Sequence, residues 1–366
     1  MKKVVAAVLF LAAANAAPAN ADIVIGVVAP LSGQYQSFGQ QMLGGVKAAV
    51  DAINAKGEMG NEQLSIASAD DQCDSAKAEE VTRKLLAAHA DVVIGSFCSN
   101  PSLAEAKVLE KAGVTLISPS ATLPAFTESG ISNVIRVSTR IDAQGSFAAR
   151  RILARRPNAK LALVDDGTAQ MKAIVQSFAG AYGKPTSLSF SFTPGQKDFA
   201  ELVAKLKAAE IDTLYLATSA PDGGRITAAA KAAGLDLKRY GPDPLLADPF
   251  WEASGPAGEA TLVSFPADPI NTSNAKNLID NLKALGEATE GPALLAYAAV
   301  ELYAAAAVAA GPHAGLGLAQ VLKSGAAVET SLGRFTFDTK GDGQDLRFSW
   351  FSWNNGVYQT IAAESQ

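Results

Sequence analysis

The residues best suited to bind a small ligand lie close together, in the stretch 70–122. This stretch contains Cys73 and Cys98, the only two cysteines of the chain. Ser99 follows the second cysteine directly, and Pro101 stands in the first turn of a predicted helix, where the missing N–H of proline costs nothing. Free N–H groups and a partial positive charge at a helix start attract anions. The combination predicts a cradle for a carboxylate.

The first 21 residues have the pattern of a cleavable secretory signal peptide. Lys2 and Lys3 form a basic start, residues 4–14 are an apolar run, and residues 19–21 fit a small-x-small cleavage site. The apolar run is about half as long as the roughly 20 residues of a membrane-spanning helix. We therefore expect export and a mature chain that begins at Asp22, without a cysteine there for a lipid anchor.

Export would place both cysteines in an oxidising compartment, where two lone cysteines usually pair. We therefore predict a disulfide between Cys73 and Cys98, which would contribute about 3 to 4 kcal/mol in the chain-entropy view. Two free buried thiols are the alternative. A shared metal is disfavoured, because His89 is the one histidine nearby and the spacing fits no zinc pattern.

Composition indicates a globular protein with two domains. Hydrophobic residues make up 48% of the chain and charged residues 18%, which is typical of a packed core. Cleavage would leave 345 of 366 residues (366 − 21), more than one core usually holds. The net charge of −5 comes without a basic stripe, so we expect no nucleic acid partner. The apolar segment 292–310 contains Glu301, which indicates a buried helix and not a membrane span.

Short apolar runs alternate with amphipathic segments through most of the chain. After the first run, a predicted helix places Leu43, Val46 and Val50 on one face and ends at Gly57. This alternation predicts parallel sheets with helices on both faces and ligands outside the carboxyl ends of the strands. The predicted strands are 23–29, 64–67, 92–95 and 114–117 in a first unit and 160–164, 188–192 and 213–216 in a second.

The segment beyond Leu262 has a different character. It lacks the strands that the core of a third domain would need, so we expect it to complete the first two domains. Its predicted elements are helices at 275–285, 292–310 and 316–323, then β segments at 333–338 and 346–353 with a turn at 354–356.

Five motifs of the chain carry a resemblance to known proteins: 70–74, 93–95 with 98–99, 117–122, 241–243, and 337–338 with 341–342. They resemble one family, the periplasmic binding proteins of type I fold, and most closely the leucine/isoleucine/valine-binding proteins of branched-chain amino acid ABC transporters. The resemblance implies an α/β fold of two doubly wound parallel-sheet lobes, joined by a hinge of three crossovers. Lobe one would comprise 22–140 plus 268–344, and lobe two 141–267 plus 345–366.

The resemblance also implies which residues bind the ligand. Ser99, Ser120 and Thr122 fall on positions that hold the α-carboxylate and α-ammonium of an amino acid. Asp243 aligns with a glutamate that accepts from the ammonium, and it is one methylene shorter. The alternatives are that Ser99 only caps a helix and that Asp243 is a turn residue between two prolines.

The side-chain pocket departs from the family pattern. Phe38 keeps an aromatic of lobe one, whereas Gln170 and Ser219 stand near the positions of two tyrosines of lobe two, and Pro292 aligns with a phenylalanine. The resemblance implies a branched-chain or other hydrophobic amino acid as the ligand. Because these replacements make the apolar wall thinner and more polar, the alternative is a more polar or larger amino acid, or an aromatic or aliphatic carboxylate without an amine.

Taken as a resemblance, these features imply a monomeric periplasmic solute-binding protein that closes on its ligand and presents it to the membrane permease of an ABC transporter. A ligand sensor or regulatory module of the same fold is the alternative.

No enzyme motif accompanies these features. The two histidines, His89 and His313, lie far apart in the chain without a Gly-x-Ser-x-Gly serine, and no Walker loop or dinucleotide fingerprint is present. Asp338, Asp342 and Asp345 lack the spacing of a calcium loop and predict a turn between two strands. We expect no enzymatic activity, no cofactor and no metal.

Overall fold

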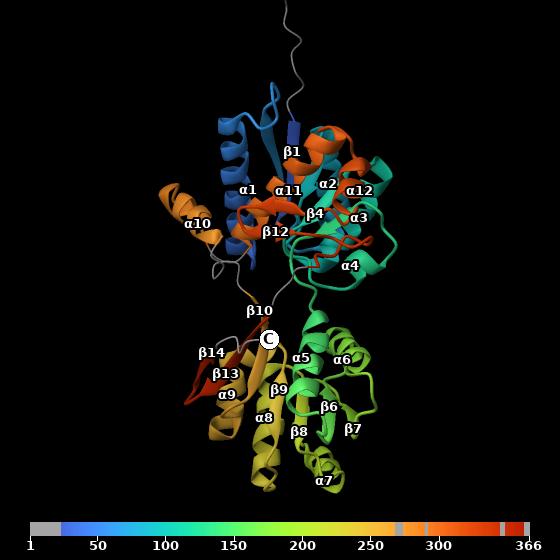
Figure 1. Cartoon of the computed structure of the whole chain (residues 1–366), viewed down its shortest axis with the longest axis vertical. Helices are drawn as coiled ribbons and strands as arrows, with labels where there is room; N and C mark the ends of the chain where they lie inside the picture. Colours follow the sequence, from blue (N-terminus) through green and yellow to red (C-terminus); the bar gives the residue numbers. More distant parts are fainter. Residues whose placement is uncertain (1–22, 268–273, 290–291, 345–347, 362–366) are drawn as a thin grey trace, which may run out of the picture.

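The computed structural model describes residues 23–267, 274–289, 292–344 and 348–361. The predicted signal peptide and Asp345 lie outside these residues. Figure 1 shows two α/β bodies, one above the other, and the upper one combines early and late parts of the chain. We call the body with the five-stranded sheet lobe one and the body with the seven-stranded sheet lobe two.

Lobe one is built on a parallel sheet with the strand order β2-β1-β3-β4-β5. Its central strands are short and apolar because both faces of the sheet are buried. The strands are β1 (Ile23–Ala29), β2 (Leu64–Asp70), β3 (Val92–Ile94), β4 (Thr115–Ser118) and β5 (Val134–Arg136).

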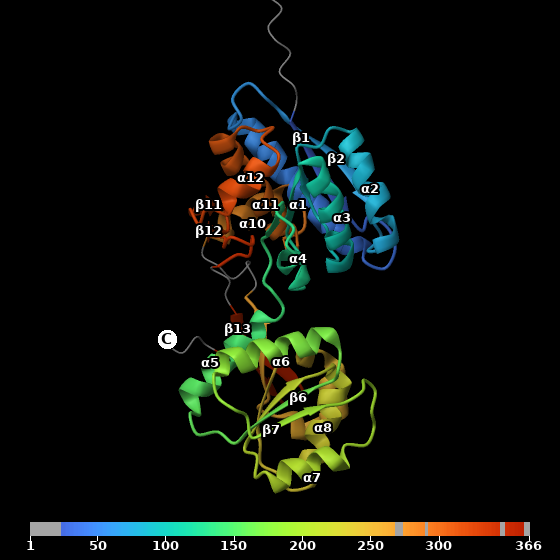
Figure 2. The same ribbon diagram turned by 90° about the vertical axis from the view of Figure 1, so that its right-hand side faces the viewer.

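Helices cover both faces of this sheet (Figure 2). On one face, α1 shares a buried cluster with α11 and with Val27 of β1. On the other face, α2 and α3 pack around the neighbouring Val28. The helix α1 ends at Gly57, whose φ of 64° is left-handed, as the sequence predicts. The bounds are α1 (Gln36–Lys56), α2 (Ser75–Ala87), α3 (Ser99–Ala112) and α4 (Ala125–Glu128).

The late helices return to lobe one and enter its core. By length and composition α11 could cross a membrane, yet 67% of its apolar window is buried inside the protein, as expected for a core helix. The returning elements are α10 (Ala275–Ala284), α11 (Ala293–Ala310), α12 (Leu316–Leu322) and the hairpin of β11 (Val328–Thr330) and β12 (Gly333–Phe335).

Lobe two contains a sheet of order β14-β13-β10-β9-β8-β6-β7. The strands β6 to β10 are parallel to one another, whereas β13 and β14 form an antiparallel hairpin at the edge. The strands are β6 (Leu161–Asp165), β7 (Leu188–Ser191), β8 (Thr213–Ala217), β9 (Lys238–Gly241), β10 (Leu262–Pro266), β13 (Phe348–Asn354) and β14 (Val357–Thr360).

The helices of lobe two are α5 (Ala143–Arg155), α6 (Ala169–Tyr182), α7 (Ala200–Ala208), α8 (Ala220–Ala232) and α9 (Asp248–Ser254), with short 3-10 helices η1 (Asp243–Leu246) and η2 (Gly255–Gly258). The chain crosses between the lobes three times: after β5, after β10 and between β12 and β13. The predicted fold class, two α/β lobes built on largely parallel sheets, is confirmed.

The sequence missed some elements of this fold, above all α5. A Cβ at Gly145 would lie 2.0 Å from the Ile174 carbonyl oxygen, so close packing of α5 on α6 demands a glycine there. Glycine weakens the helical signal in a sequence. The helix α8 begins at Ala220, because the Ser219 side chain caps it.

Candidate functional site

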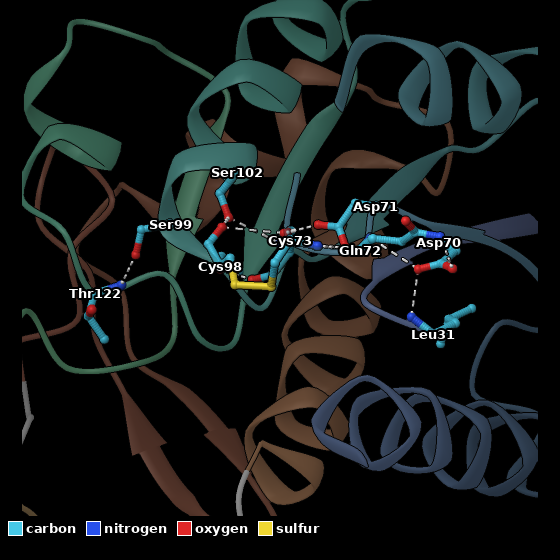
Figure 3. The surroundings of a disulfide bond; sticks show 11 residues. Leu31, Asp70, Asp71, Gln72, Cys73, Cys98, Ser99, Ser102 and Thr122 are labelled. Atoms are coloured by element: carbon cyan, nitrogen blue, oxygen red, sulfur yellow. Dashed lines mark hydrogen bonds between the residues drawn. A yellow bond between two sulfur atoms is a disulfide. The ribbon is translucent and has the colours of Figure 1, made fainter. Parts of the chain in front are cut away.

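The disulfide between Cys73 and Cys98 joins two loops at the carboxyl edge of the lobe-one sheet (Figure 3). The two Cα atoms lie 5.4 Å apart, so the bridge ties the loop after β2 to the start of α3. The predicted pairing is confirmed.

We expect the variant with Cys73→Ser and Cys98→Ser to lose about 2 to 4 kcal/mol of unfolding free energy, because its unfolded chain is less constrained. Urea unfolding with and without reductant measures the change, and reductant should affect only the parent. Equal stability of parent and variant in the absence of reductant would contradict a structural role for the bridge.

The two aspartates beside the first cysteine hold loops together. Asp70 accepts the backbone N–H of Leu31 at 2.8 Å, and the buried Asp71 accepts the Ser96 hydroxyl at 2.7 Å and the Cys73 N–H at 3.1 Å (Figure 3). Both carboxylates thus accept hydrogen bonds from neighbouring loops of the protein. They connect the loops that surround the candidate site.

Ser99 is the first residue of α3, and Cys98, not Ser99, occupies the N-cap position. The Ser99 Oγ accepts the backbone N–H of Thr122 at 3.0 Å (Figure 3). It also accepts the backbone N–H of Leu123 at 3.3 Å. A hydroxyl has two lone pairs and one proton, so this oxygen has only its proton left to offer. Ser99 can therefore bind only an acceptor, such as a carboxylate, and it is not the simple helix cap of the alternative interpretation.

Residues 118–123, here called the ligand loop, follow β4. The Ser118 Oγ accepts the N–H of Ala121 at 2.9 Å, which bends the loop toward Ser99. Ser120 and Thr122 are half-buried, and the structure records no partner for their hydroxyls within its described residues. The Ile141 N–H donates to the Thr122 carbonyl at 3.0 Å, so the first crossover touches the ligand loop directly.

A buried arginine supports the ligand loop from behind. Arg136, which is fully buried, donates to the carbonyl oxygens of Ala121 at 2.6 Å and Leu123 at 2.9 Å. Its Nε meets Asp342 at 2.8 Å, and Arg140 meets the other oxygen of that carboxylate at 2.9 Å. Burial opposes ionisation of Asp342, but the two guanidinium groups hold its pKa below the usual value.

Aromatic side chains lie beside this cradle in lobe one. The rings of Phe38, from α1, and Phe97, just before Cys98, are stacked with centroids 4.9 Å apart and planes 8° apart. The ring centroid of Tyr35 lies 5.8 Å from that of Phe97. The sequence singled out Phe38 and missed Phe97, although its place next to Cys98 and Ser99 was a signal.

Asp243 opens η1 at the carboxyl end of β9 in lobe two. Gln144 of α5 binds both the side chain and the backbone of Asp243. Its Nε2 donates to Asp243 Oδ1 at 2.8 Å, and its Oε1 accepts the Asp243 N–H at 3.0 Å. Ser264 also donates to Gln144 Oε1, at 3.2 Å, so the orientation of the amide follows from its partners. Burial raises the pKa of Asp243, and the described residues offer it no cation.

The first crossover brings these two groups into one region. Ile141 bonds Thr122 of lobe one, and three residues later Gln144 bonds Asp243 of lobe two. The loop that Ser99 binds and the Asp243 carboxylate therefore lie at the two ends of the segment 141–144.

Gln170 and Ser219 also lie at the carboxyl edge of the lobe-two sheet. Gln170 is half-buried in the first turn of α6. Ser219 caps α8 because its Oγ accepts the Asp222 N–H at 3.4 Å. The same hydroxyl donates to the Asp222 carboxylate at 2.9 Å, and the Ser219 N–H donates to Asp166 at 3.1 Å. The structure thus gives Ser219 a local structural role, and its part in ligand binding stays a prediction.

The turn residues near the end of lobe one also have defined partners. Asp338 Oδ1 accepts the N–H groups of Lys340, Gly341 and Asp342 in a tight turn. Within the described residues, no group of three or more acidic, cysteine or histidine side chains could hold a metal ion.

Two α/β lobes joined by three crossings of the chain are the architecture of bilobed solute-binding proteins. The chain matches the family model "Periplasmic binding protein" over residues 22–351 and belongs to this family. It is 31% identical to the Leu/Ile/Val-binding protein BraC3 of Rhizobium johnstonii, over 99% of both chains. It is 30% identical to the leucine-specific-binding protein of Salmonella typhimurium, over 99% of this chain and 98% of that one.

Among solved structures, the chain resembles the branched-chain amino acid transporter substrate-binding protein LivJ of Streptococcus pneumoniae in complex with isoleucine. The TM-score is 0.66 and the identity 25%, over 93% of this chain and 99% of that one.

Proposed function

We propose that this protein is the periplasmic solute-binding component of an ABC importer and that it binds a small amino acid, branched-chain or otherwise hydrophobic, between two closing lobes. The proposal rests on one observation: the candidate site contains a hydroxyl that can only donate and a carboxylate without a cationic partner among the described residues. Ser99 has only its proton to offer, and Asp243 is a partly buried carboxylate whose described partners are neutral. A zwitterionic α-amino acid supplies what both lack.

The names of relatives support this proposal. The Rhizobium and Salmonella proteins are named for leucine, isoleucine and valine binding or for leucine binding, and the Streptococcus protein contains isoleucine. Contacts of one ligand with both lobes would stabilise the closed form, which a permease could then recognise.

The remaining parts of the proposal follow the sequence. We place a signal peptide at 1–21, lobe one at 22–140 plus 268–344 and lobe two at 141–267 plus 345–366, in a monomer. Ser120 and Thr122 would complete the cradle in lobe one, while Phe38, Gln170 and Ser219 would surround the side chain of the ligand.

A thermal-shift screen of the purified mature protein tests the function. Amino acids, and the matching carboxylates without an amine, are added singly; a ligand at 100 times its Kd stabilises by about 2.7 kcal/mol. We expect a shift with a hydrophobic amino acid and none with its deaminated analogue. A shift with amine-free acids alone would overturn the role of Asp243.

We expect Ser99→Ala to weaken amino acid binding about 10- to 150-fold, because a hydrogen bond to a charged group contributes about 1.5 to 3 kcal/mol. Ser75→Ala is a matched control, since exposed Ser75 holds the same first position in α2. Isothermal titration calorimetry compares both variants with the parent. Equal affinity of Ser99→Ala and the parent would rule out the carboxylate cradle.

A further inference from the structure

His313 lies in the short loop between α11 and α12, at the edge of the lobe-one sheet where the parallel strands begin. Both nitrogens of its imidazole ring face carboxylates. The Nδ1 atom lies 2.6 Å from Asp91 Oδ1, and the Nε2 atom lies 3.2 Å from Glu62 Oε1. Glu62 shortly precedes β2 and Asp91 directly precedes β3, so one side chain from late in the chain contacts two early loops.

The loop that carries His313 is held on both sides. The hydroxyl of Tyr303, which is buried in α11, donates to the Pro312 carbonyl at 3.1 Å. The hydroxyl of Thr115, at the start of β4, donates to the Gly315 carbonyl at 2.7 Å. The backbone on either side of the imidazole is therefore fixed to the core of lobe one, and the ring is positioned against the two carboxylates.

A neutral imidazole cannot donate to both carboxylates. It has one N–H donor and one acceptor nitrogen, whereas the protonated ring donates from both nitrogens. Ionised carboxylates only accept, so both contacts of His313 are hydrogen bonds only when the ring is charged. In the described part of the chain, neither Asp91 nor Glu62 forms an ion pair with a lysine or arginine. Loss of the proton would therefore leave two carboxylates without a cation.

The titratable groups around the ring favour its charged form. They are Asp91, Glu62 and, beside these, the Tyr303 hydroxyl, whose own pKa is raised by burial and by both carboxylates, so that it stays neutral. The hydrogen bond to Asp91 raises the pKa of His313 above its usual value of about 6.5; Glu62 adds to this, and partial burial opposes it. The folded protein therefore binds this proton more tightly than the unfolded chain. The resulting stabilisation is complete below about pH 6.5 and is lost as the pH rises through the folded-state pKa.

We propose that His313 is a proton-operated clasp, which ties the loop between α11 and α12 to the loops before β2 and β3 when the ring is charged and releases them when it is neutral. The clasp joins the returning part of lobe one to its early part. It lies at the edge of the sheet opposite the disulfide between Cys73 and Cys98, so the inference does not depend on the ligand proposed above.

Histidine NMR of the mature protein, purified without a histidine tag, tests the clasp, because the chain contains only two histidines, His89 and His313. His89→Gln assigns the two signals. We expect the His313 ring to titrate with a midpoint above about pH 6.5, and Glu62→Gln to lower that midpoint. A parent midpoint at or below about pH 6.5, or one that Glu62→Gln leaves unchanged, would overturn the proposal.

Urea unfolding measures what the clasp contributes to the fold. His313→Gln should lower the urea midpoint at about pH 5.5 and leave it unchanged at a pH well above the NMR midpoint, where the parent ring is already neutral. His89→Gln is the matched control, because His89 is exposed and has no recorded carboxylate contact among the described residues. It should leave the difference between the two urea midpoints unchanged. An equal loss at both pH values in His313→Gln would show that packing and not the proton is responsible, and would overturn the clasp.

Discussion

Asp243→Asn should abolish most of the affinity for amino acids, by roughly 30-fold to several thousand-fold. Truncating one partner of a buried charge pair costs about 2 to 5 kcal/mol. The asparagine Oδ1 can still accept the Gln144 Nε2–H bond that the structure shows at 2.8 Å. The fold should therefore survive, and the lost charge should act on the ligand ammonium alone. Calorimetric titration with the preferred amino acid measures the loss.

Asp243→Glu is the matched variant, since it keeps the charge and restores the residue type of the resembled family. We expect it to retain binding within about tenfold, with the longer side chain changing the fit. Unfolding free energy should not fall in Asp243→Asn, because burial already disfavours the charged form and raises the pKa of Asp243. Full affinity in Asp243→Asn would exclude this carboxylate as the ammonium partner.

The raised pKa of Asp243 also predicts how binding depends on pH. Binding requires the ionised carboxylate, and the ligand ammonium stabilises that form, so the bound protein has the lower pKa. Affinity should therefore be complete above the pKa of the free protein and should fall as the pH drops through it. Asp243→Asn should lack this acid-side loss, which titrations at several pH values would reveal.

Arg136→Met should lower the unfolding free energy by about 3 to 5 kcal/mol, as expected when one partner of a buried ion pair is removed. Arg136 donates to Asp342 at 2.8 Å, to the Thr127 Oγ1 at 2.8 Å and to the carbonyls on both sides of Thr122, so its loss removes hydrogen bonds to four oxygens at once. The folded fraction should also bind ligand more weakly, because the ligand loop is released. Urea unfolding and calorimetry on the same preparation measure both effects.

Arg83→Met is the control for this prediction. Arg83 pairs with Glu79 one helical turn away on the surface, where such a pair is stabilising by about 0.3 to 0.5 kcal/mol. A similar small loss in Arg136→Met would mean that the Asp342 network does not support the fold. Arg136→Lys should behave like Arg136→Met in ligand binding, since lysine cannot reproduce the guanidinium fork that spans these oxygens.

Features that depend on neighbours in sequence were predictable. The strand at Ile23–Ala29 follows from a continuous apolar run, and the end of α1 follows from Gly57. The disulfide between Cys73 and Cys98 follows from cysteine number and export. The short strand β5 and the helix α5 were missed, because three residues give little periodicity and Gly145 lowers helix propensity.

Features that depend on segments far apart in sequence were not predictable. Gln144 and Asp243 are 99 residues apart, and Arg136 and Asp342 are 206 apart. Neither hydropathy nor spacing in one chain indicates such partners, because the crossovers between lobes bring them together. The same holds for the stack of Phe38 on Phe97.

The sequence by itself therefore determined the fold class and several parts of the candidate site: two α/β units, a loop closed by a disulfide and a hydroxyl at a helix start. Only the tertiary structure decided that the Ser99 hydroxyl keeps just its proton to donate, since that depends on the N–H groups of a loop after another strand. It also decided that Asp243 is held by a neutral amide. Folding brings distant segments together and thereby decides which donors and acceptors of a side chain are occupied. The sequence alone therefore cannot show which of these groups stay available for a ligand.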